Sequence, residues 1–221
     1  AYEFHSLDEL KHIPTDFDIF YPTTVMETGY DILRWWVARM VMLGIYMQKK
    51  LGEENAEKQI PFQDIVLHGL VKDPLGKKMS KSKGNVINPL EIVDQYGADA
   101  VRFALTYGTA LGNDQALSYP KLDAMRKFTN KLWNMARFIE FKSEGKLKPS
   151  AFSIEELSKN AKNKSDKEMV KKTKDLVKDI TRLLSAYDFN HAAQNLYEFT
   201  WHEFADIYIE DVKERIDDNS F

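Results

Sequence analysis

The sequence predicts a fold of class α/β plus all-α, with an α/β domain at residues 1–118 and a helical domain at residues 119–221. In the first part, two segments rich in β-branched and aromatic residues flank a segment with helical periodicity. The second part repeats apolar residues every three or four positions over long stretches. A turn-rich segment, residues 108–120, separates the two patterns and marks the predicted boundary.

The α/β part is expected to hold a parallel pair of strands. Asp18–Glu27 has the composition of a strand, Tyr30–Gln48 has the periodicity of a helix, and Asp64–His68 is a short apolar strand. Leu51–Pro61 is a polar connection. Strand, helix and strand at these spacings fit a right-handed parallel crossover.

A loop and two short helices are expected to complete the first part. The loop covers Gly69–Gly84. The first helix begins at Asn88, a capping residue that precedes a proline at the first helical position. The second helix follows Gly97 and covers Ala98–Tyr107.

The second part is predicted to be a bundle of long helices. The predicted helices are Lys121–Phe141, Ser165–Ala186 and Phe189–Ile209, with an interruption at Ser143–Pro149. The last two helices are joined by a short connection in which Asn190 is the candidate cap. A connection this short between long amphipathic helices favours antiparallel packing.

Composition excludes several classes of protein. The 221 residues have a formal net charge of −3 and are 43% hydrophobic, which is typical of a globular protein. The sequence has no cysteine, which excludes disulfide scaffolds, iron–sulfur clusters and Cys-based zinc sites, and fits a cytoplasmic location. The N-terminal residues show no targeting pattern. Ile32–Met47 is interrupted by two arginines and is shorter than the ~20 apolar residues of a membrane span, so we expect no membrane partner.

Basic side chains are concentrated in two stretches. Lys72–Lys83 holds five lysines and one aspartate, and residues 142–178 hold eleven lysines and six acidic residues. Residues 179–221 instead hold three basic and ten acidic residues. Because surface charges are screened beyond about 8 Å in physiological salt, a polyanionic partner would sense each stretch separately.

The lysine-rich loop is the best candidate for binding chemistry. Lysine ammonium groups, serine hydroxyls and the amides beside glycines can all bind phosphate oxygens. A loop after a parallel strand also lies where open α/β sheets bind ligands. A Walker loop is excluded because the spacing from Gly69 to Gly76 is wrong and Lys77 is followed by another lysine. The alternative is a solvated lysine loop, and in either case we expect it to be mobile without ligand.

The string Lys78-Met79-Ser80-Lys81-Ser82 resembles the KMSKS signature of class I aminoacyl-tRNA synthetases. The blocks FYPTTVMETGYDILRWWVARM, YGADAVRFALTYGT and FTNKLWNMARF are similar to the valyl branch in order and spacing. The resemblance implies an ATP-dependent ligase that activates valine and joins it to tRNA(Val), with Mg²⁺ accompanying ATP and no zinc. The alternatives are an isoleucyl or leucyl relative, or a free-standing, non-catalytic tRNA-binding module.

The other family signature, HIGH, does not occur around any of the five histidines. The resemblance therefore implies the second half of a Rossmann-type nucleotide-binding fold with its KMSKS loop, followed by an anticodon-binding helical bundle. We expect such a piece to be a monomer and to be inactive alone.

The resemblance also implies individual roles near ATP and the amino acid. Gly29 and Asp31 match positions that hold the ATP ribose, His68 a position near adenine, and Trp36 a position in the amino-acid pocket. From the residues alone, Asp31 could instead cap a helix. Likewise Trp36 could be a core residue, and His68 could be bound by backbone at a strand end.

Lys78 and Lys81 match the two catalytic lysines that stabilise the departing pyrophosphate. Met79, Ser80 and Ser82 complete the ATP-binding signature. In the helical part, Phe138 matches a family position that stacks on an anticodon base, and we expect Arg137 to contact phosphate. Trp133 lies about 140° around the helix from Phe138, and we assign it to the core.

Overall fold

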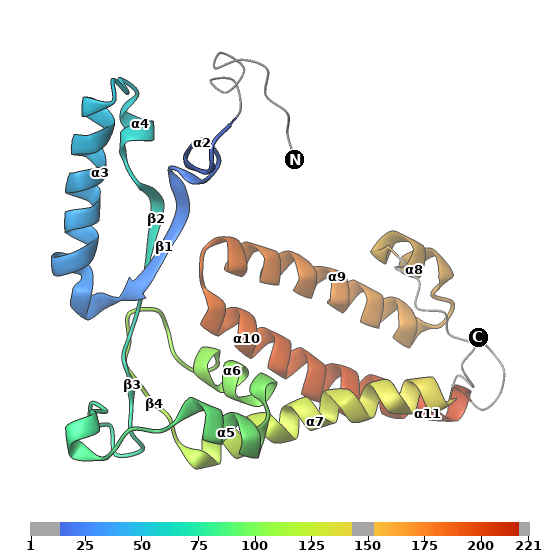
Figure 1. The fold of residues 1–221 in the computed structure, drawn as a ribbon. Helices are drawn as coiled ribbons and strands as arrows, with labels where there is room; N and C mark the ends of the chain where they lie inside the picture. Colours follow the sequence, from blue (N-terminus) through green and yellow to red (C-terminus); the bar gives the residue numbers. More distant parts are fainter. Residues whose placement is uncertain (1–13, 143–152, 217–221) are drawn as a thin grey trace, which may run out of the picture. The chain divides into compact units, whose positions relative to one another are not determined.

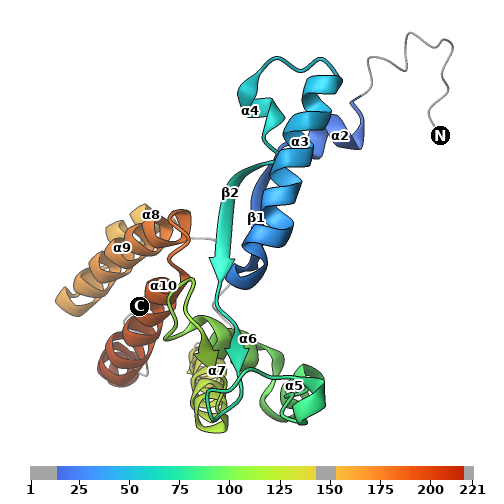
Figure 2. The ribbon, with the colours of Figure 1, turned by 90° about the vertical axis from the view of Figure 1, so that its left-hand side faces the viewer.

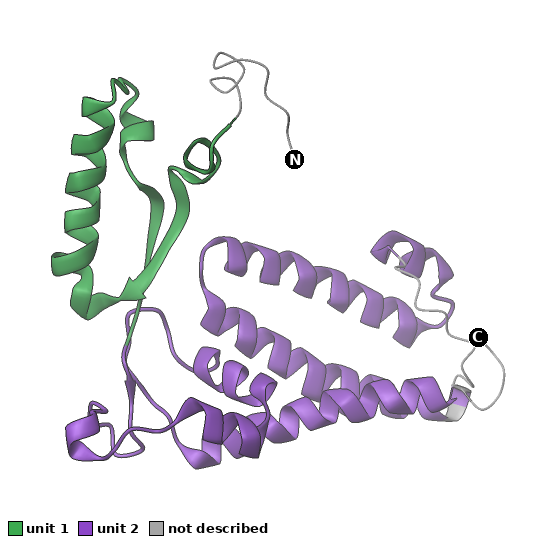
Figure 3. Cartoon of the chain, viewed as in Figure 1, with its two compact units in different colours: residues 1–69 green, residues 70–221 purple. Residues whose placement is uncertain are grey.

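The computed structural model describes residues 14–142 and 153–216, which belong to two compact units. Unit 1 comprises residues 1–69 and unit 2 residues 70–221 (Figure 3). This division of contacts falls earlier in the chain than the predicted boundary at 118/119, which stays a prediction. Each unit is described below by itself.

Unit 1 begins with a helix where a strand was predicted. The Thr15 hydroxyl accepts a hydrogen bond from the Asp18 amide, and Asp18 accepts one in return from the Thr15 amide at 2.8 Å. This reciprocal capping box starts helix α2, Asp16–Phe20. Strand β1 follows at Thr23–Gly29. The predicted strand at Asp18–Glu27 is therefore wrong over its first five residues. The first three belong to α2, because the cap outweighs their β propensity, and β1 begins only at Thr23.

The predicted parallel pair of strands is confirmed. Strand β2, Phe62–His68, pairs in parallel with β1, in a register that places Gly29 opposite His68. The predicted helix between them is confirmed, although it begins as a 3-10 turn, η1 (Tyr30–Ile32), and a π-helical turn, η2 (Leu33–Val37), before α3 (Ala38–Lys50). Helix α3 runs beside the two strands (Figures 1 and 2), and the polar connection contains a short helix, α4 (Ala56–Gln59).

Among the described residues of unit 1, few side chains are buried. Val37 and Val66 are its buried aliphatic residues, and the buried amide of Gln59 donates to the backbone carbonyl of Glu53 at 2.7 Å. Many large apolar side chains of α3, including Met42 and Leu43, are exposed. A parallel pair of strands with a long helix between them is a small α/β unit, and the finer assignment to half of a Rossmann-type fold stays a prediction.

Unit 2 begins with the lysine-rich loop and two helices. Strand β3 (Val71–Lys72) pairs in parallel with β4 (Gln115–Ala116), and neither strand was predicted. Turn η3 covers Lys81–Lys83. As predicted, α5 (Pro89–Tyr96) is capped by the Asn88 side chain, and α6 (Ala98–Thr106) starts after Gly97, whose φ of +87° favours glycine.

The rest of unit 2 is helical, as predicted. Its elements are α7 (Tyr119–Lys142), α8 (Ile154–Asn160), α9 (Lys164–Ser185), α10 (Phe189–Glu198), the π-helical η4 (Phe199–Ile209) and α11 (Glu210–Ile216). Helices α9 and α10 lie antiparallel (Figure 1), and the cap of α10 is Asp188 rather than Asn190. Helix α8 was not predicted, and the predicted interruption at Ser143–Pro149 lies outside the described residues.

The core of unit 2 lies where α5, α6 and α7 meet. Ala104 and Leu122 are almost fully buried there. Phe128 of α7 connects this core to the C-terminal helices, because its ring lies 4.7 Å from that of Tyr197 and 6.1 Å from that of Trp201. Through these contacts α7 packs against α10 and η4.

Ion pairs connect α9 to η4 and α11. Lys172 Nζ lies 2.6 Å from Glu203 Oε2, and Arg215 Nη2 lies 2.9 Å from Asp166 Oδ1. The Tyr208 hydroxyl donates to the same Asp166 carboxylate, and burial beside it raises the pKa of Tyr208 to about 12. Within the residues described, we find no helix that is both long enough and apolar enough to cross a membrane.

Candidate functional site

The first group of predicted site residues meets at the carboxyl end of the parallel strands in unit 1. Gly29 ends β1, His68 ends β2, and Asp31 lies in the turn that follows Gly29. A Cβ atom on Gly29 would lie 2.9 Å from Asp31 Oδ1 and 3.5 Å from His68 Cε1. A side chain at this position would force the Asp31 carboxylate to shift. The backbone conformation of Gly29, with φ −64°, is one that any residue adopts.

The His68 imidazole has two polar neighbours. Its Nδ1 lies 2.7 Å from the Gly69 carbonyl oxygen, which is the backbone contact that the sequence left open, and its Nε2 lies 3.2 Å from Glu27 Oε1. Glu27 was not among the predicted site residues. The pairing of β1 with β2 places Glu27 near His68, and the sequence does not show this register directly.

Trp36 lies on the π-helical turn η2 and is 59% exposed. The alternative that it is a core residue is therefore wrong. Its indole presents an open apolar surface, as a wall against an aliphatic side chain requires, and its place in an amino-acid pocket stays a prediction.

The second group of predicted site residues belongs to the KMSKS loop of unit 2. Lys72 and Lys78 form an isolated antiparallel bridge that closes a short hairpin. At its turn, Asp73 is 6% exposed, and its Oδ1 accepts hydrogen bonds from the amides of Leu75 (3.0 Å) and Lys77 (2.8 Å). Gly76, at φ +74°, completes the turn.

The signature residues themselves differ in their surroundings. Met79 and Ser80 are half-buried, and Met79 Sδ accepts a hydrogen bond from the Ile87 amide at 3.3 Å. Lys78, Lys81 and Ser82 are exposed. The turn Lys81–Lys83 is closed by hydrogen bonds from Lys83 N to Ser80 O and from Gly84 N to Lys81 O. The half-buried residues Met79 and Ser80 thus lie between residues with exposed ammonium and hydroxyl groups, which are groups that bind phosphate.

Asp73 and Asn85 were missed as members of this site. Asn85 lies twelve positions after Asp73, and its Nδ2 donates to Asp73 Oδ2 at 2.8 Å. This bond and that from the Lys77 amide hold the pKa of Asp73 below its ordinary value, against the opposite effect of burial. The glycine-asparagine extension of the signature was the available signal for Asn85, whereas nothing in the sequence distinguished Asp73 from a solvated loop aspartate.

The lowered pKa of Asp73 makes a prediction about pH. The charged carboxylate stabilises the loop above the ordinary aspartate pKa of about 4, and this stabilisation is lost as the pH falls through the lower folded value. We expect the Leu75 and Lys77 amide resonances to stay constant from neutral pH to about 4 and to shift only below it. An NMR pH titration of this chain, with Asp73→Asn as the control that should lack the transition, measures this. A transition at or above about 4 would contradict the assignment.

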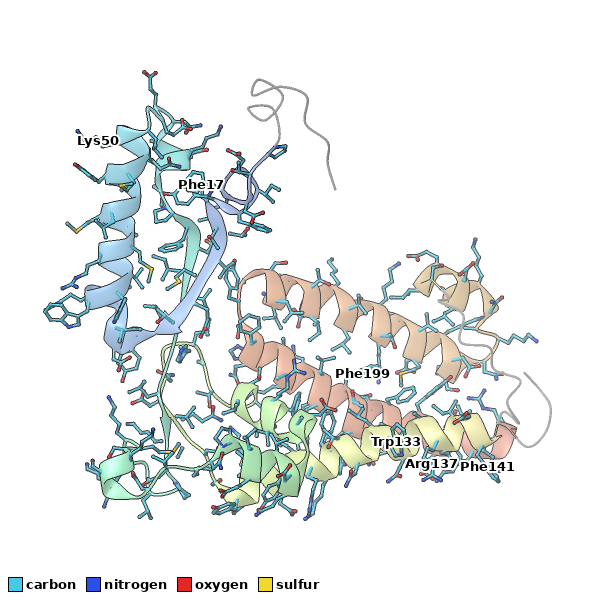
Figure 4. All side chains as sticks on the ribbon, viewed as in Figure 1. Phe17, Lys50, Trp133, Arg137, Phe141 and Phe199 are labelled. Carbon is cyan, nitrogen blue, oxygen red and sulfur yellow. The ribbon has the colours of Figure 1, made fainter. Side chains whose placement is uncertain are left out.

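In the helical part, the structure places Trp133 and Arg137, four positions apart, on one exposed face of α7, and Phe138 elsewhere on the helix. Trp133 is 67% exposed, so its assignment to the core is wrong: the buried face of α7 carries Leu122, Met125 and Phe128 instead. Arg137 is exposed, as expected of a phosphate contact. Figure 4 labels both side chains on α7.

Phe138 lies on a different face of α7 and lines a groove of about 410 Å³ between α7 and the η4–α11 segment. The ring is half-buried, and Lys213 Nζ lies 5.7 Å from its centroid. Lys131, which also lines the groove, pairs with Asp206 at 2.5 Å. The groove therefore combines a half-buried aromatic ring with amide, basic and acidic side chains, and the acidic residues Asp206 and Glu210 pair with two of its lysines.

Across residues 14–142 and 153–216, no three His, Cys, Asp or Glu side chains come together as a metal site would require.

Comparison with known families divides the chain in two. The family described as tRNA synthetases class I (I, L, M and V) matches residues 4–118, and the anticodon-binding domain of tRNA ligase matches residues 166–221. A valine--tRNA ligase from Dehalococcoides mccartyi (strain CBDB1) is 43% identical in sequence over an alignment that covers 93% of this chain. One from Clostridium acetobutylicum is 41% identical over 90% of this chain. The chain spans only 22% and 21% of their lengths, about a fifth.

Two solved structures share the fold. The Agrobacterium radiobacter K84 LeuRS, in a ternary complex with tRNA and LeuAMS, aligns with 80% of this chain and 23% of its own, with a TM-score of 0.65 and 22% identity. The Mycobacterium tuberculosis methionyl-tRNA synthetase, in complex with methionyl-adenylate, aligns with 83% of this chain and 33% of its own, with a TM-score of 0.59 and 20% identity.

Proposed function

This chain belongs to the class I tRNA synthetases, and we propose that it is the part of a valine--tRNA ligase that carries the KMSKS loop and an anticodon-binding bundle. The observation that carries the proposal is 43% identity to a valine--tRNA ligase over 93% of the chain. The partners of the whole enzyme are then valine, ATP and tRNA(Val).

The reaction proceeds in two steps. The valine carboxylate attacks the α-phosphate of ATP, a phosphorus–oxygen bond forms, and the bond to the β-phosphate breaks to release pyrophosphate. A terminal hydroxyl of the tRNA then attacks the valyl carbonyl and releases AMP. Neither step requires a side-chain nucleophile, so positioning and electrostatic stabilisation are the main tasks of the protein.

Lys78 and Lys81 carry the electrostatic task in this proposal. Negative charge grows on the β- and γ-phosphates as the bond to the α-phosphate breaks, and an ammonium group beside it lowers the barrier. The exposed Lys81 side chain on turn η3 is free to reach such a ligand. Mg²⁺ would enter with ATP, bound largely through phosphates and water.

Gly29, Asp31 and His68 carry the nucleoside task. The Asp31 carboxylate can accept hydrogen bonds from both ribose hydroxyls, and glycine at position 29 permits close approach to the backbone. The His68 ring lies on the neighbouring strand end, and we assign it to the adenine side of the nucleoside. The exposed indole of Trp36 then contributes an apolar wall for valine.

ATP–pyrophosphate exchange by the full-length protein that contains this chain tests the proposal. We expect exchange that depends on valine and is at least tenfold slower with isoleucine or leucine, since one methylene in an apolar pocket changes the rate by about 10- to 200-fold. Faster exchange with isoleucine or leucine would assign the protein to those relatives. Binding of tRNA(Val) without exchange would identify a non-catalytic tRNA-binding module.

The groove beside α7 leads to a prediction about tRNA. We expect Phe138→Ala to weaken tRNA(Val) binding by about 1–3 kcal/mol with an unchanged salt slope, because a stacking contact is lost. We expect Arg137→Ala to weaken binding of all tRNAs and to reduce the slope of log affinity against log salt by about 0.7–0.9, because a phosphate contact is lost. Salt titrations against tRNA(Val) and one mismatched tRNA measure both.

Trp133→Ala is the matched control for loss of an aromatic ring from another face of the same helix. Because Trp133 lies on the exposed face that also carries Arg137, we expect this change to weaken tRNA(Val) binding less than Phe138→Ala does and to leave the salt slope unchanged. If Phe138→Ala unfolds unit 2, which circular dichroism would show, the ring is structural and the assignment of Phe138 to RNA fails.

A further inference from the structure

The Asn85 side chain reaches both sides of Met79 in the KMSKS loop. Its Oδ1 accepts a hydrogen bond from the Ser80 amide at 2.9 Å, and its Nδ2 donates to the Lys78 carbonyl at 3.3 Å. One amide group therefore fixes the peptide groups immediately before and after Met79. We infer that Asn85 and Asp73 form a clamp that positions the two catalytic lysines, an inference that rests on the proposed function.

Asp73 fixes Asn85 in turn. The Asn85 Nδ2 donates to Asp73 Oδ2 at 2.8 Å, while Oδ1 of the same buried carboxylate accepts the amides of Leu75 and Lys77. The Asp73 amide also donates to the Lys77 carbonyl at 3.0 Å. Three segments of the loop, the hairpin turn, the signature and the glycine-asparagine extension, are thus joined through two side chains.

The clamp acts on the backbone of the signature, through hydrogen bonds to the peptide groups beside Met79. Lys78 is held at its carbonyl, and Lys81 follows Ser80, whose amide is held, at the start of a turn closed by Gly84. Both lysine side chains are exposed. Asp73 and Asn85 are therefore positioning residues, because they act on the phosphates only through the lysines.

In the clamp Asn85 donates a hydrogen bond and Asp73 accepts it, and exchanging the two residues tests this arrangement. Both Asp73 oxygens accept hydrogen bonds, so Asp73→Asn would turn an NH₂ group toward the NH₂ group of Asn85 or toward backbone amides. Asn85→Asp would set two carboxylates against each other. The double variant D73N/N85D restores one donor and one acceptor between the two positions and keeps an acceptor for the Ser80 amide, but the Lys78 carbonyl loses its donor. It has the same composition and net charge as the unmodified chain.

Valine-dependent ATP–pyrophosphate exchange by the full-length ligase is the first measurement. We expect D73N and N85D each to lower kcat by about 10- to 100-fold, because a misplacement of about 1 Å can cost 10²-fold. We expect KM for valine to change less than threefold, because the clamp does not act on the amino-acid pocket. The double variant should be at least about threefold faster than either single variant, because the contact between positions 73 and 85 is restored while the donor to the Lys78 carbonyl is not. Equal losses in all three variants, or a rise in KM for valine that matches the fall in kcat, would overturn the positioning role.

Hydrogen exchange of the Ser80 and Lys77 amides in the 221-residue chain is the second measurement, and it does not depend on the reaction. We expect N85D to speed exchange at Ser80 and D73N to speed it at Lys77, with slow exchange restored in the double variant. Unchanged exchange in the single variants would overturn the clamp itself. Absence of valine-dependent exchange activity in the unmodified ligase would instead overturn the proposed function.

Discussion

Lys81→Ala in the full-length ligase is expected to lower the rate of valyl-adenylate formation by about 10²–10³-fold, the usual cost of losing one preorganised contact to developing charge. KM for valine should change only a few-fold, because the ammonium acts on phosphate charge that grows toward the transition state. Lys81 begins turn η3, where its side chain is exposed and its carbonyl closes the turn onto Gly84. Removing the side chain should therefore leave the loop backbone intact. Single-turnover adenylate formation and exchange kinetics measure the two quantities.

Lys83→Ala is the matched control for this experiment. Lys83 lies on the same turn and is also exposed, but it follows the signature rather than belonging to it. We expect a rate within about threefold of the unmodified enzyme. A loss in Lys83→Ala comparable to that in Lys81→Ala would show that the loop acts through its total charge, and the specific role of Lys81 would be wrong.

The loop illustrates how far the sequence could predict the site. The five signature residues led to the prediction that the loop binds phosphate, because a signature of consecutive residues can be recognised in a single sequence. The hydrogen bonds that shape the loop join Asp73 to Asn85, twelve positions away, and such a contact between side chains has no periodic pattern. Whether the loop moves when no ligand is bound stays a prediction, but its hairpin and signature are joined by hydrogen bonds.

The elements were predicted best where apolar periodicity and caps agreed. Helix α5 begins where Asn88 and Pro89 predicted, and β1 pairs with β2 in parallel as expected. The start of β1 was wrong because a capping box at Thr15 and Asp18 formed a helix in a segment of high β propensity. The prediction used the β propensity of the residues in this segment, and the hydrogen bonds of the capping box outweigh that propensity.

Helix α7 shows a second limit of periodicity. Its aromatic residues are spaced so that several could belong to the buried face, and Trp133 was assigned to that face. Burial is decided by where α6 and η4 contact the helix, and they contact it at Phe128 rather than at Trp133. The choice between neighbouring faces of an amphipathic helix depends on packing partners, and a single sequence does not identify these.

Leu122→Ala is expected to destabilise unit 2 by about 2–5 kcal/mol, the usual cost of truncating a buried leucine when its surroundings collapse only in part. Leu122 is 1% exposed, and it belongs to the core formed with α5 and α6. Its loss would leave a cavity where α7 meets these helices. Urea unfolding of the chain, followed by circular dichroism at the helical wavelengths, measures the change in midpoint, and the m-value should be unchanged if the same surface unfolds.

Leu132→Ala makes the same chemical change on the same helix at a site that is 40% exposed. We expect it to cost less than about 1 kcal/mol, because less apolar surface returns to water and the site can open to solvent rather than form a cavity. Both variants remove the same atoms and make the same change in helix propensity, so the difference between them isolates burial. If the two costs were equal, the packing of α7 against α5 and α6 would not be the core of unit 2.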